Sequence, residues 1–401
     1  MPEATFPLWN SNYTKIWIAN FTIFFSFMLL TPLLPIYLHD TFGADNHTIG
    51  IVLSGYTLMA LLSRAFSGFM VDSFPRKLVL VVCFAFFSVF FLGYILAGSL
   101  MLFAIVRTLH GVPFGGVTVA NSTVAIDVLH PSRRAEGIGY YGLSNNIATA
   151  ISPSVAIWIY QQTHNFNIIF AIAMITAVAG LIINTTIHLP QKEIPVPAPS
   201  VPNKKPVVSL DRFFLLKGWP LALSMIGFAF SYGVVSTYVA IYGQERLNIT
   251  GGAGIFFLLL SIGLILSRLQ GSKSLREGKV SHNAAIGIGV SLFGYLMFAA
   301  VAHPVTYYGA ALVIGLGNGH MYPAFQTMFI NLAPHTQRGT ANSSLLVSWD
   351  VGIGIGILLG GIISEHLGYS HAFWAAWIFN LAGALIFYLS GRRYFDTNKL
   401  R

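Results

Sequence analysis

The sequence predicts an all-α membrane protein of twelve transmembrane helices in two pseudo-symmetric six-helix bundles. The chain of 401 residues is 55% hydrophobic and only 9% charged, whereas a soluble domain usually carries about 25% charged residues. Apolar segments of roughly 20 residues, the length of a membrane helix, fill nearly the whole chain. Three pairs of residues also repeat at one offset of 204 positions: Arg64 and Arg268, Asp127 and Asn331, and Arg134 and Arg338.

The twelve expected spans follow one another with short connections. Their approximate bounds are 16–38, 47–70, 77–97, 99–121, 137–160, 166–188, 213–243, 252–269, 281–302, 304–331, 340–366 and 370–391. The single cysteine, Cys83, lies within the third span, so no disulfide framework is possible. No remaining segment is long enough to form a separate soluble domain.

A proline-rich segment divides the chain in two. Residues 189–211 contain six prolines and Lys204-Lys205, a composition typical of an extended, semi-rigid linker. This linker separates six spans in residues 1–188 from six spans in residues 212–401. Because six is even, both halves cross the membrane in the same direction, as parallel repeats about an axis along the membrane normal. Duplicated bundles of this kind commonly hold a solute site between halves that rock against each other, so transport is the first functional hypothesis.

The placement of the basic residues predicts the orientation of the chain. The net charge is +9, and among the loop Lys and Arg residues only Arg246 falls on one side of the membrane, while the others alternate to the opposite side. The positive-inside rule therefore predicts a multi-pass protein of a bacterial cytoplasmic (inner) membrane with both termini in the cytoplasm. A nucleic-acid-binding patch would not be divided among alternate loops. We expect the lipid bilayer, and no nucleic acid, as a partner.

The loop after the second span carries the first recognisable motif. Its sequence, GFMVDSFPRK, resembles the signature G-x-x-x-D-R-x-G-R-R/K of the major facilitator superfamily, and it matches at Gly68, Asp72, Arg76 and Lys77. Serine and proline replace the usual arginine and glycine at positions 73 and 75. The resemblance implies the major facilitator fold and a loop that latches the two halves on the cytoplasmic side. A solvated loop acid is the alternative interpretation of Asp72.

Further motifs extend the resemblance over essentially the whole chain. Arg107-Thr-Leu-His110-Gly111 is similar to the family motif R-x-x-Q/H-G, whose arginine is tied to proton coupling or substrate contact. The turn from Asp127 to Gly137 resembles D-x-x-P-x-x-R-x-x-x-x-G, which we interpret as structural. The small residues around Pro153 resemble the antiporter motif G-x-x-x-G-P-x-x-G-G, so the 12-helix drug/proton antiporter-like branch is the nearest one, although plain helix packing would also select small residues.

One acid lies deep within an expected span. Asp350 is about 15 Å along the eleventh span, near the middle of a hydrocarbon core of about 30 Å. An aspartate at that depth is costly and by default functional. Its best partner is Arg64, and the offset of 204 places Asn146 and Arg268 in the equivalent positions. We hypothesise a charged contact Arg64–Asp350 and a neutral contact Arg268–Asn146, of which protonation of Asp350 would weaken only the first.

Two other interpretations of Asp350 stay open. It could pair with His320 or Arg107 across the interior, or it could form a permanent structural ion pair. The proton-coupling and gating set is therefore Asp350, Arg64, Arg107, Asn146 and Arg268.

Other polar residues are candidates to contact a substrate. They share expected positions facing the bundle interior on spans 1, 4, 5, 7 and 10: Asn20, His110, Asn145, Tyr232, Tyr238, Asn318, His320 and Gln326. Hydrogen bonding or helix packing is the commoner explanation for each one alone. Together they suggest a moderately polar cavity.

The functional prediction is proton-coupled export of a small organic molecule by alternating access. A proton-linked importer of a sugar or metabolite is the nearest alternative, and a non-transporting membrane sensor is a further one. We expect protons and a small-molecule substrate as partners, no cofactor and no metal, and a monomer. No paired nucleophile and base, phosphate loop or zinc spacing is present, so we do not expect an enzyme.

Overall fold

The computed structural model describes residues 7–44, 46–189, 210–249 and 252–400. Within these ranges the side chains of residues 46, 47, 50, 252–253, 268–269, 272–273 and 276 are not described. The described chain is helical throughout, without a strand, and the predicted all-α architecture is confirmed.

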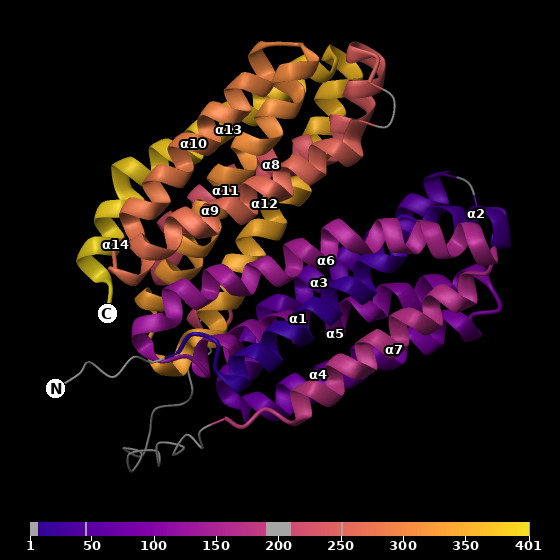
Figure 1. Cartoon of the computed structure of the whole chain (residues 1–401), viewed down its shortest axis with the longest axis horizontal. Helices are drawn as coiled ribbons and strands as arrows, with labels where there is room; N and C mark the ends of the chain where they lie inside the picture. The colour runs from indigo at the N-terminus through magenta and orange to yellow at the C-terminus, as the bar shows by residue number, and fades with distance from the viewer. Residues whose placement is uncertain (1–6, 45, 190–209, 250–251, 401) are drawn as a thin grey trace.

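The N-terminal part of the chain forms one bundle, drawn in indigo to magenta in Figure 1. Its helices are α1 (Ser11–Leu30), α2 (Leu34–Phe42), α3 (Asn46–Ser73), α4 (Arg76–Leu96), α5 (Leu100–Asp127), α6 (Arg134–Thr163) and α7 (Phe166–Thr185). We call it the N-bundle.

The rest of the chain forms a second bundle, drawn in orange to yellow. Its helices are α8 (Trp219–Leu247), α9 (Gly252–Arg276), α10 (Val280–Ala300), α11 (Pro304–Leu332), α12 (Arg338–Leu367), α13 (Tyr369–Ile386) and α14 (Arg392–Asn398), with a π-helical turn at Phe387–Gly391. We call it the C-bundle.

The first expected span is not one helix. The prediction of an unbroken span over 16–38 is wrong, because α1 ends at Leu30 and α2 begins at Leu34. Pro32 and Pro35 lack the backbone N–H that continues a helix, and a proline ring clashes with the carbonyl one turn earlier. Pro35 lies in the first turn of α2, where a proline is tolerated. The seventh span also begins later than predicted, at Trp219, after a 3-10 turn at Leu216–Gly218.

Length and hydropathy identify nine of the described helices as able to cross a membrane. The three other predicted spans fall on α6, α9 and α11, which are 30, 25 and 29 residues long. These helices are less apolar. Both α6 and α11 pack against helices of the opposite bundle, so part of their surface faces protein rather than lipid.

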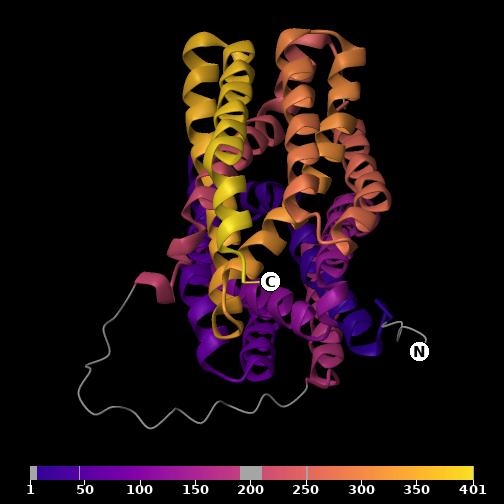
Figure 2. The same ribbon diagram turned by 90° about the vertical axis from the view of Figure 1, so that its left-hand side faces the viewer.

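The two bundles lie side by side and are closest at one end. We call this the linker end, because Leu189 and Leu210 lie there, and we call the opposite end the far end. Figure 1 shows the bundles meeting at the linker end and diverging toward the far end, and Figure 2 shows the same bundles from the side. The backbones of the two bundles are therefore nearest each other at the linker end.

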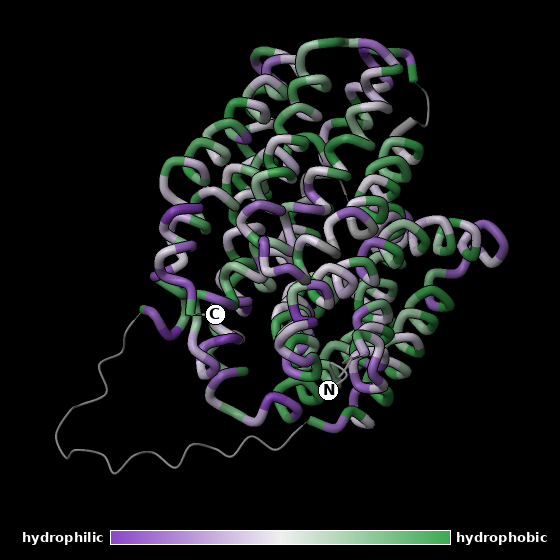
Figure 3. Tube along the Cα trace, turned by 60° about the vertical axis from the view of Figure 1, so that its left-hand side comes forward, coloured by the Kyte–Doolittle hydropathy of each residue, from purple (hydrophilic) through white to green (hydrophobic). Residues whose placement is uncertain are grey.

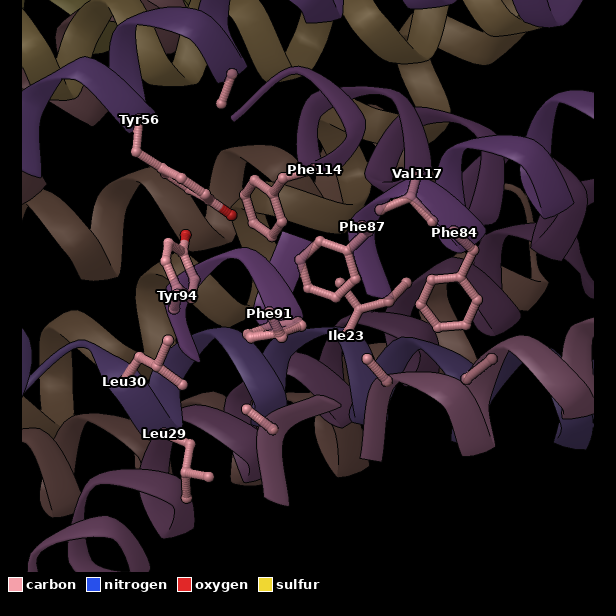
Figure 4. Close-up of a cluster of buried hydrophobic side chains, with 14 of the residues drawn as sticks. Ile23, Leu29, Leu30, Tyr56, Phe84, Phe87, Phe91, Tyr94, Phe114 and Val117 are labelled. Carbon is pink, nitrogen blue, oxygen red and sulfur yellow. The ribbon is translucent and has the colours of Figure 1, made fainter. Parts of the chain in front are cut away.

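The outer surface is suited to lipid. Large apolar side chains are exposed along the helices, among them Phe86, Val89, Ile175 and Leu358. Figure 3 shows hydrophobic residues running along the helices while hydrophilic residues gather at the turns. The buried interior of the N-bundle is rich in aromatic rings, and Figure 4 shows several of them packed together. Because the outer surface and the bundle interiors are largely apolar, the polar groups between the bundles are the first candidates for function.

Candidate functional site

An ion pair joins the two bundles. Arg64 lies on α3, about 14 Å from the linker end of that helix, and Asp350 lies on α12, about 18 Å from the linker end of α12. Nη1 of Arg64 donates a hydrogen bond to Oδ2 of Asp350, and the two side chains are 9% and 19% exposed. The charged contact expected from the sequence is thus present. Of the two alternative partners, His320 bonds Asn283 and Arg107 bonds Tyr94.

Aromatic rings flank both members of the pair. The guanidinium of Arg64 lies 5.7 Å from the centre of the Phe114 ring. Trp349 directly precedes Asp350 on α12, and its ring is 5.4 Å from that of Tyr232 and 5.3 Å from that of Tyr322. Tyr232 was expected to face the interior, whereas Tyr322 was missed because a tyrosine in an apolar span resembles ordinary core. The low exposure of both side chains to solvent strengthens the electrostatic attraction within the pair.

A second contact forms where α12 begins. The carboxylate of Asp72, on the last turn of α3, accepts hydrogen bonds from the backbone N–H of Gly339 at 2.8 Å and of Thr340 at 2.7 Å, and from the Thr340 hydroxyl at 2.9 Å. The first N–H groups of a helix lack intrahelical partners, and the helix dipole favours a negative charge there. Asp72 therefore caps a helix of the opposite bundle.

Gly68 allows this close approach. A Cβ atom on Gly68 would lie 2.9 Å from the carbonyl oxygen of Gly339 and 2.9 Å from Cβ of Ser343, closer than real Cβ atoms come. Only glycine fits where α3 crosses α12, which is how small residues act in membrane helix packing.

Arg76 extends the contact to a charged network at the linker end. It donates to the carboxylates of Asp127 and Asp72 and, at 3.2 Å, to the backbone carbonyl of His335. Arg338 of the C-bundle donates to the same Asp127 at 3.1 Å. Asp127 and Arg338, interpreted from the sequence as helix-end residues, thus also hold the bundles together. Lys77 is half-buried and forms no ion pair with any residue that the structure describes.

A buried amide forms a further bridge that the sequence analysis missed. Nδ2 of Asn342 on α12 donates to the hydroxyl of Ser122 on α5, while Oδ1 of Asn342 accepts from Nε2 of Gln326 on α11 at 2.8 Å. Asn342 is fully buried. Ser122 and Gln326 are themselves separated by 204 positions, so one asparagine binds equivalent positions of both repeats. That offset is the signal that could have identified Ser122, Gln326 and their common partner.

Asn20 lies within the N-bundle. Its Nδ2 donates to the Ser144 hydroxyl at 2.8 Å, and its Oδ1 accepts from the Tyr141 hydroxyl at 2.7 Å. Asn121 also donates to the Tyr141 oxygen at 2.8 Å. These bonds join α1, α5 and α6, so Asn20 has a full set of partners inside its own bundle.

His110 and Arg107 belong to an aromatic cluster in the N-bundle. Nη1 of Arg107 donates to the Tyr94 hydroxyl at 3.1 Å, and the Tyr94 oxygen lies 2.6 Å from Nδ1 of His110. The ring of His110 stacks on Phe90 and packs at 5.5 Å from that of Tyr56. Neither residue lies beside Asp350 in this arrangement.

The C-bundle candidates also have local partners. Oδ1 of Asn318 accepts from the Ser291 hydroxyl at 3.2 Å, and the Tyr238 hydroxyl donates to the backbone carbonyl of Ile357 at 2.7 Å. His320 and Gln326 each line a small cavity between the bundles, the first beside Glu136 and the second beside Ser122.

The contact expected between Arg268 and Asn146 falls outside the described residues, because the side chain of Arg268 is not described. Asn146 is half-buried on α6. The neighbouring Asn145 accepts from the hydroxyl of Thr149 at 3.2 Å. The eight substrate candidates thus do not meet at one point, and Tyr232 is the one whose ring packs on Trp349, the residue before Asp350.

Comparison with known proteins agrees with this geometry. A family model described as "Major Facilitator Superfamily" matches residues 16–282 and again residues 279–399. The "Staphylopine export protein" of Staphylococcus aureus (strain Mu50) is 24% identical over 382 residues, which is 93% of each chain.

Two solved structures share the fold. The human organic anion transporter MFSD10 (TETRAN) superposes with a TM-score of 0.76 at 14% identity, over 94% of this chain and 98% of that one. FucP, a transporter solved in the outward conformation, superposes with a TM-score of 0.75 at 12% identity, over 96% of this chain and 99% of the other. At this identity the likeness extends to the fold alone.

Proposed function

Since the chain belongs to the Major Facilitator Superfamily, we propose that it exports a small organic molecule in exchange for protons by alternating access. The protein is a multi-pass membrane transporter and not an enzyme. A relative of nearly equal length, 24% identical over 93% of this chain, is named as an export protein. That name supports the direction of transport proposed here, which is the one property drawn from this relative.

The ion pair between Arg64 and Asp350 is the observation that carries the proton coupling. It joins the bundles away from the charged network of the linker end, and a single proton can alter it, because protonated Asp350 is neutral and loses most of its attraction to Arg64. Breaking a buried pair by neutralising one partner typically costs about 3–5 kcal/mol. The proton would therefore weaken the contact between α3 and α12, and its release would restore that contact.

The linker-end contacts supply the gate in this proposal. The positive-inside pattern places the linker end in the cytoplasm, so the present arrangement would be closed to the cytoplasm by Gly68, Asp72 and Arg76. Protonation of Asp350 and separation of these contacts would open the same side and close the far end. Arg268 and Asn146 would form the equivalent contact in the other repeat, without a titrating acid.

Flux in liposomes tests the proposal. The purified protein would be reconstituted into liposomes with a pH-sensitive dye inside and screened with a panel of metabolites and drugs under a pH gradient. We expect a transported compound and protons to move in opposite directions, and transport by Asp350→Asn to lose its dependence on the pH gradient. Asp396→Asn, which removes a half-exposed acid of α14, is the matched control and should keep that dependence.

Three outcomes would count against parts of the proposal. Unchanged coupling in Asp350→Asn would remove Asp350 from the proton pathway. Movement of protons and solute in the same direction would favour a proton-linked importer of a sugar or metabolite. Binding of a panel compound without any flux would favour a non-transporting sensor.

A further inference from the structure

The N-bundle holds a buried cation, Arg107, that no acid among its described residues balances. Arg107 is 4% exposed, and its guanidinium lies 4.1 Å from the centre of the Tyr56 ring and 5.7 Å from that of Phe27. Its hydrogen bond goes to the neutral hydroxyl of Tyr94. Among the residues that the structure describes, no carboxylate pairs with Arg107, whereas the equally buried Arg64 has Asp350. Cation–π contacts offset only part of the cost of burying a charge.

Two hydrogen-bond donors next to this charge have no partner. Nε of Arg107 and the hydroxyl of Tyr56 are both buried and unbonded. The rings of Tyr56 and Tyr94 each lie 5.5 Å from the ring of His110, and Figure 4 shows their hydroxyl ends pointing toward each other. Buried donors are normally bonded, and leaving one unpaired is costly. One uncompensated positive charge beside two free donors indicates that an acceptor with negative charge is missing.

A carboxylate has the matching chemistry. It carries one negative charge and two acceptor oxygens, which suit a guanidinium N–H and a nearby hydroxyl. A dianionic phosphate would bring a second negative charge that no described side chain of the cluster neutralises. Phe27, Phe114 and Phe91 pack around the cluster, so an apolar or aromatic body beside the carboxylate would meet apolar neighbours.

We propose that Arg107 and Tyr56 form a binding site for a carboxylate of the transported solute, with the Tyr94 hydroxyl holding the guanidinium of Arg107 in place. This inference rests on the proposed function, because it names the class of substrate: small organic acids. Arg107 then acts on the solute while Asp350 carries the proton.

The position of the cluster fits entry of a solute from the far end. Arg107 lies about 10 Å from the far end of α5, on the side of the molecule where the bundles diverge. Phe27 is partly exposed and covers Tyr56 and Phe114 with stacked contacts at 5.0 and 4.8 Å. The break between α1 and α2 follows Phe27 by one turn. Interrupted helices commonly border transporter sites, and this break allows the Phe27 cover to move.

A binding measurement on the intact purified protein tests the site. Thermal unfolding would be followed in nanodiscs against increasing sodium benzoate, with sodium chloride adjusted to constant ionic strength. Benzamide serves as the uncharged isostere and sodium phosphate as the inorganic anion. We expect benzoate alone to raise the unfolding midpoint in the wild type. The apparent Kd should weaken at least about tenfold in Arg107→Gln and about three- to tenfold in Tyr56→Phe, which keeps the ring and removes the unbonded hydroxyl.

The control variant is Arg246→Gln, which removes an exposed arginine at the far end and should bind benzoate like the wild type. Absence of benzoate stabilisation in the wild type, equal stabilisation by benzamide or phosphate, or unchanged affinity in both Arg107→Gln and Tyr56→Phe would each overturn the proposal. Because this assay needs no flux, benzoate binding without transport would refute the proposed function and leave the site standing. Transport without Arg107-dependent binding of benzoate would support the proposed function and refute the carboxylate site.

Discussion

The two seams that join the bundles come from equivalent parts of the repeat and differ in polarity. The first seam, between α3 or α5 and α12, contains the ion pair of Asp350, the amide bridge of Asn342 and the capped N-terminus of α12 at Thr340. The offset of 204 positions relates these three residues to Asn146, Ile138 and Glu136 of α6. That helix packs against α9 and α11 in the second seam, where Ile138 joins a buried apolar cluster of the C-bundle.

This difference in polarity allows a symmetric scaffold to respond unequally to one proton. If both seams carried the same acid, protonation would weaken both and the bundles would separate rather than rock. The first seam contains the acid Asp350, and the equivalent position of the second seam is Asn146, which does not titrate. We therefore expect the first seam to open and the second to act as the pivot. The first seam would then contribute more than the second to the free energy that keeps the linker end closed.

Loss of Arg76 should have the largest effect. Arg76→Gln removes the buried charge that binds Asp127, Asp72 and the carbonyl of His335, and we expect the closed arrangement to lose about 3 kcal/mol. Spin labels on cysteines at Ser132 and Thr336, two exposed and repeat-equivalent positions of the linker end, would report the opening as a longer distance in a Cys83→Ser background.

Lys77→Gln is the matched control for that variant. It removes the adjacent basic residue of the same motif, which forms no ion pair with a described residue, and its effect on the label distance should stay below about 0.5 kcal/mol. Equal opening by both variants would mean that net charge, and not the contacts of Arg76, closes the linker end.

Gly68→Ala should have the next largest effect. The added methyl group would lie 2.9 Å from both the Gly339 carbonyl oxygen and Cβ of Ser343, so the helices must move apart at a cost of about 2 kcal/mol. The same labels would show partial opening. Gly354→Ala places a methyl group on α12 where nothing lies within 4 Å, and it should leave the distance unchanged. A closed linker end in Gly68→Ala would show that α3 and α12 can accommodate the added methyl group without moving apart.

The sequence predicted the helical architecture and its family, and both are confirmed. The contact between Arg64 and Asp350 could also be anticipated, because a charge inside a membrane span is costly and usually pairs with an opposite charge. The break after Leu30 was missed, although Pro32 and Pro35 both mark it, since apolar composition continues across it.

The polar candidates were harder to place. Asn20, His110 and Asn318 are bonded within their own bundles, because a helix has polar neighbours on several sides and composition does not say which side a residue faces. The uncompensated charge of Arg107 could not be inferred either. A motif shows that an arginine is present, whereas the missing acid becomes apparent only when its neighbours are known.

The smallest effect should come from Asn342, and it tests the polarity of the seams most directly. Asn342→Leu makes this position apolar, like its equivalent Ile138, and removes the bonds to Ser122 and Gln326. We expect the closed arrangement to lose about 1 kcal/mol, because Ser122 keeps a bond to the Thr118 carbonyl while the Gln326 amide loses its partner. Ser122→Ala alone should cost less, and the double variant should show less than the sum of both effects by the spin-label distance. Strict additivity would mean that the two residues act separately, and the amide bridge would then contribute nothing to the difference between the seams.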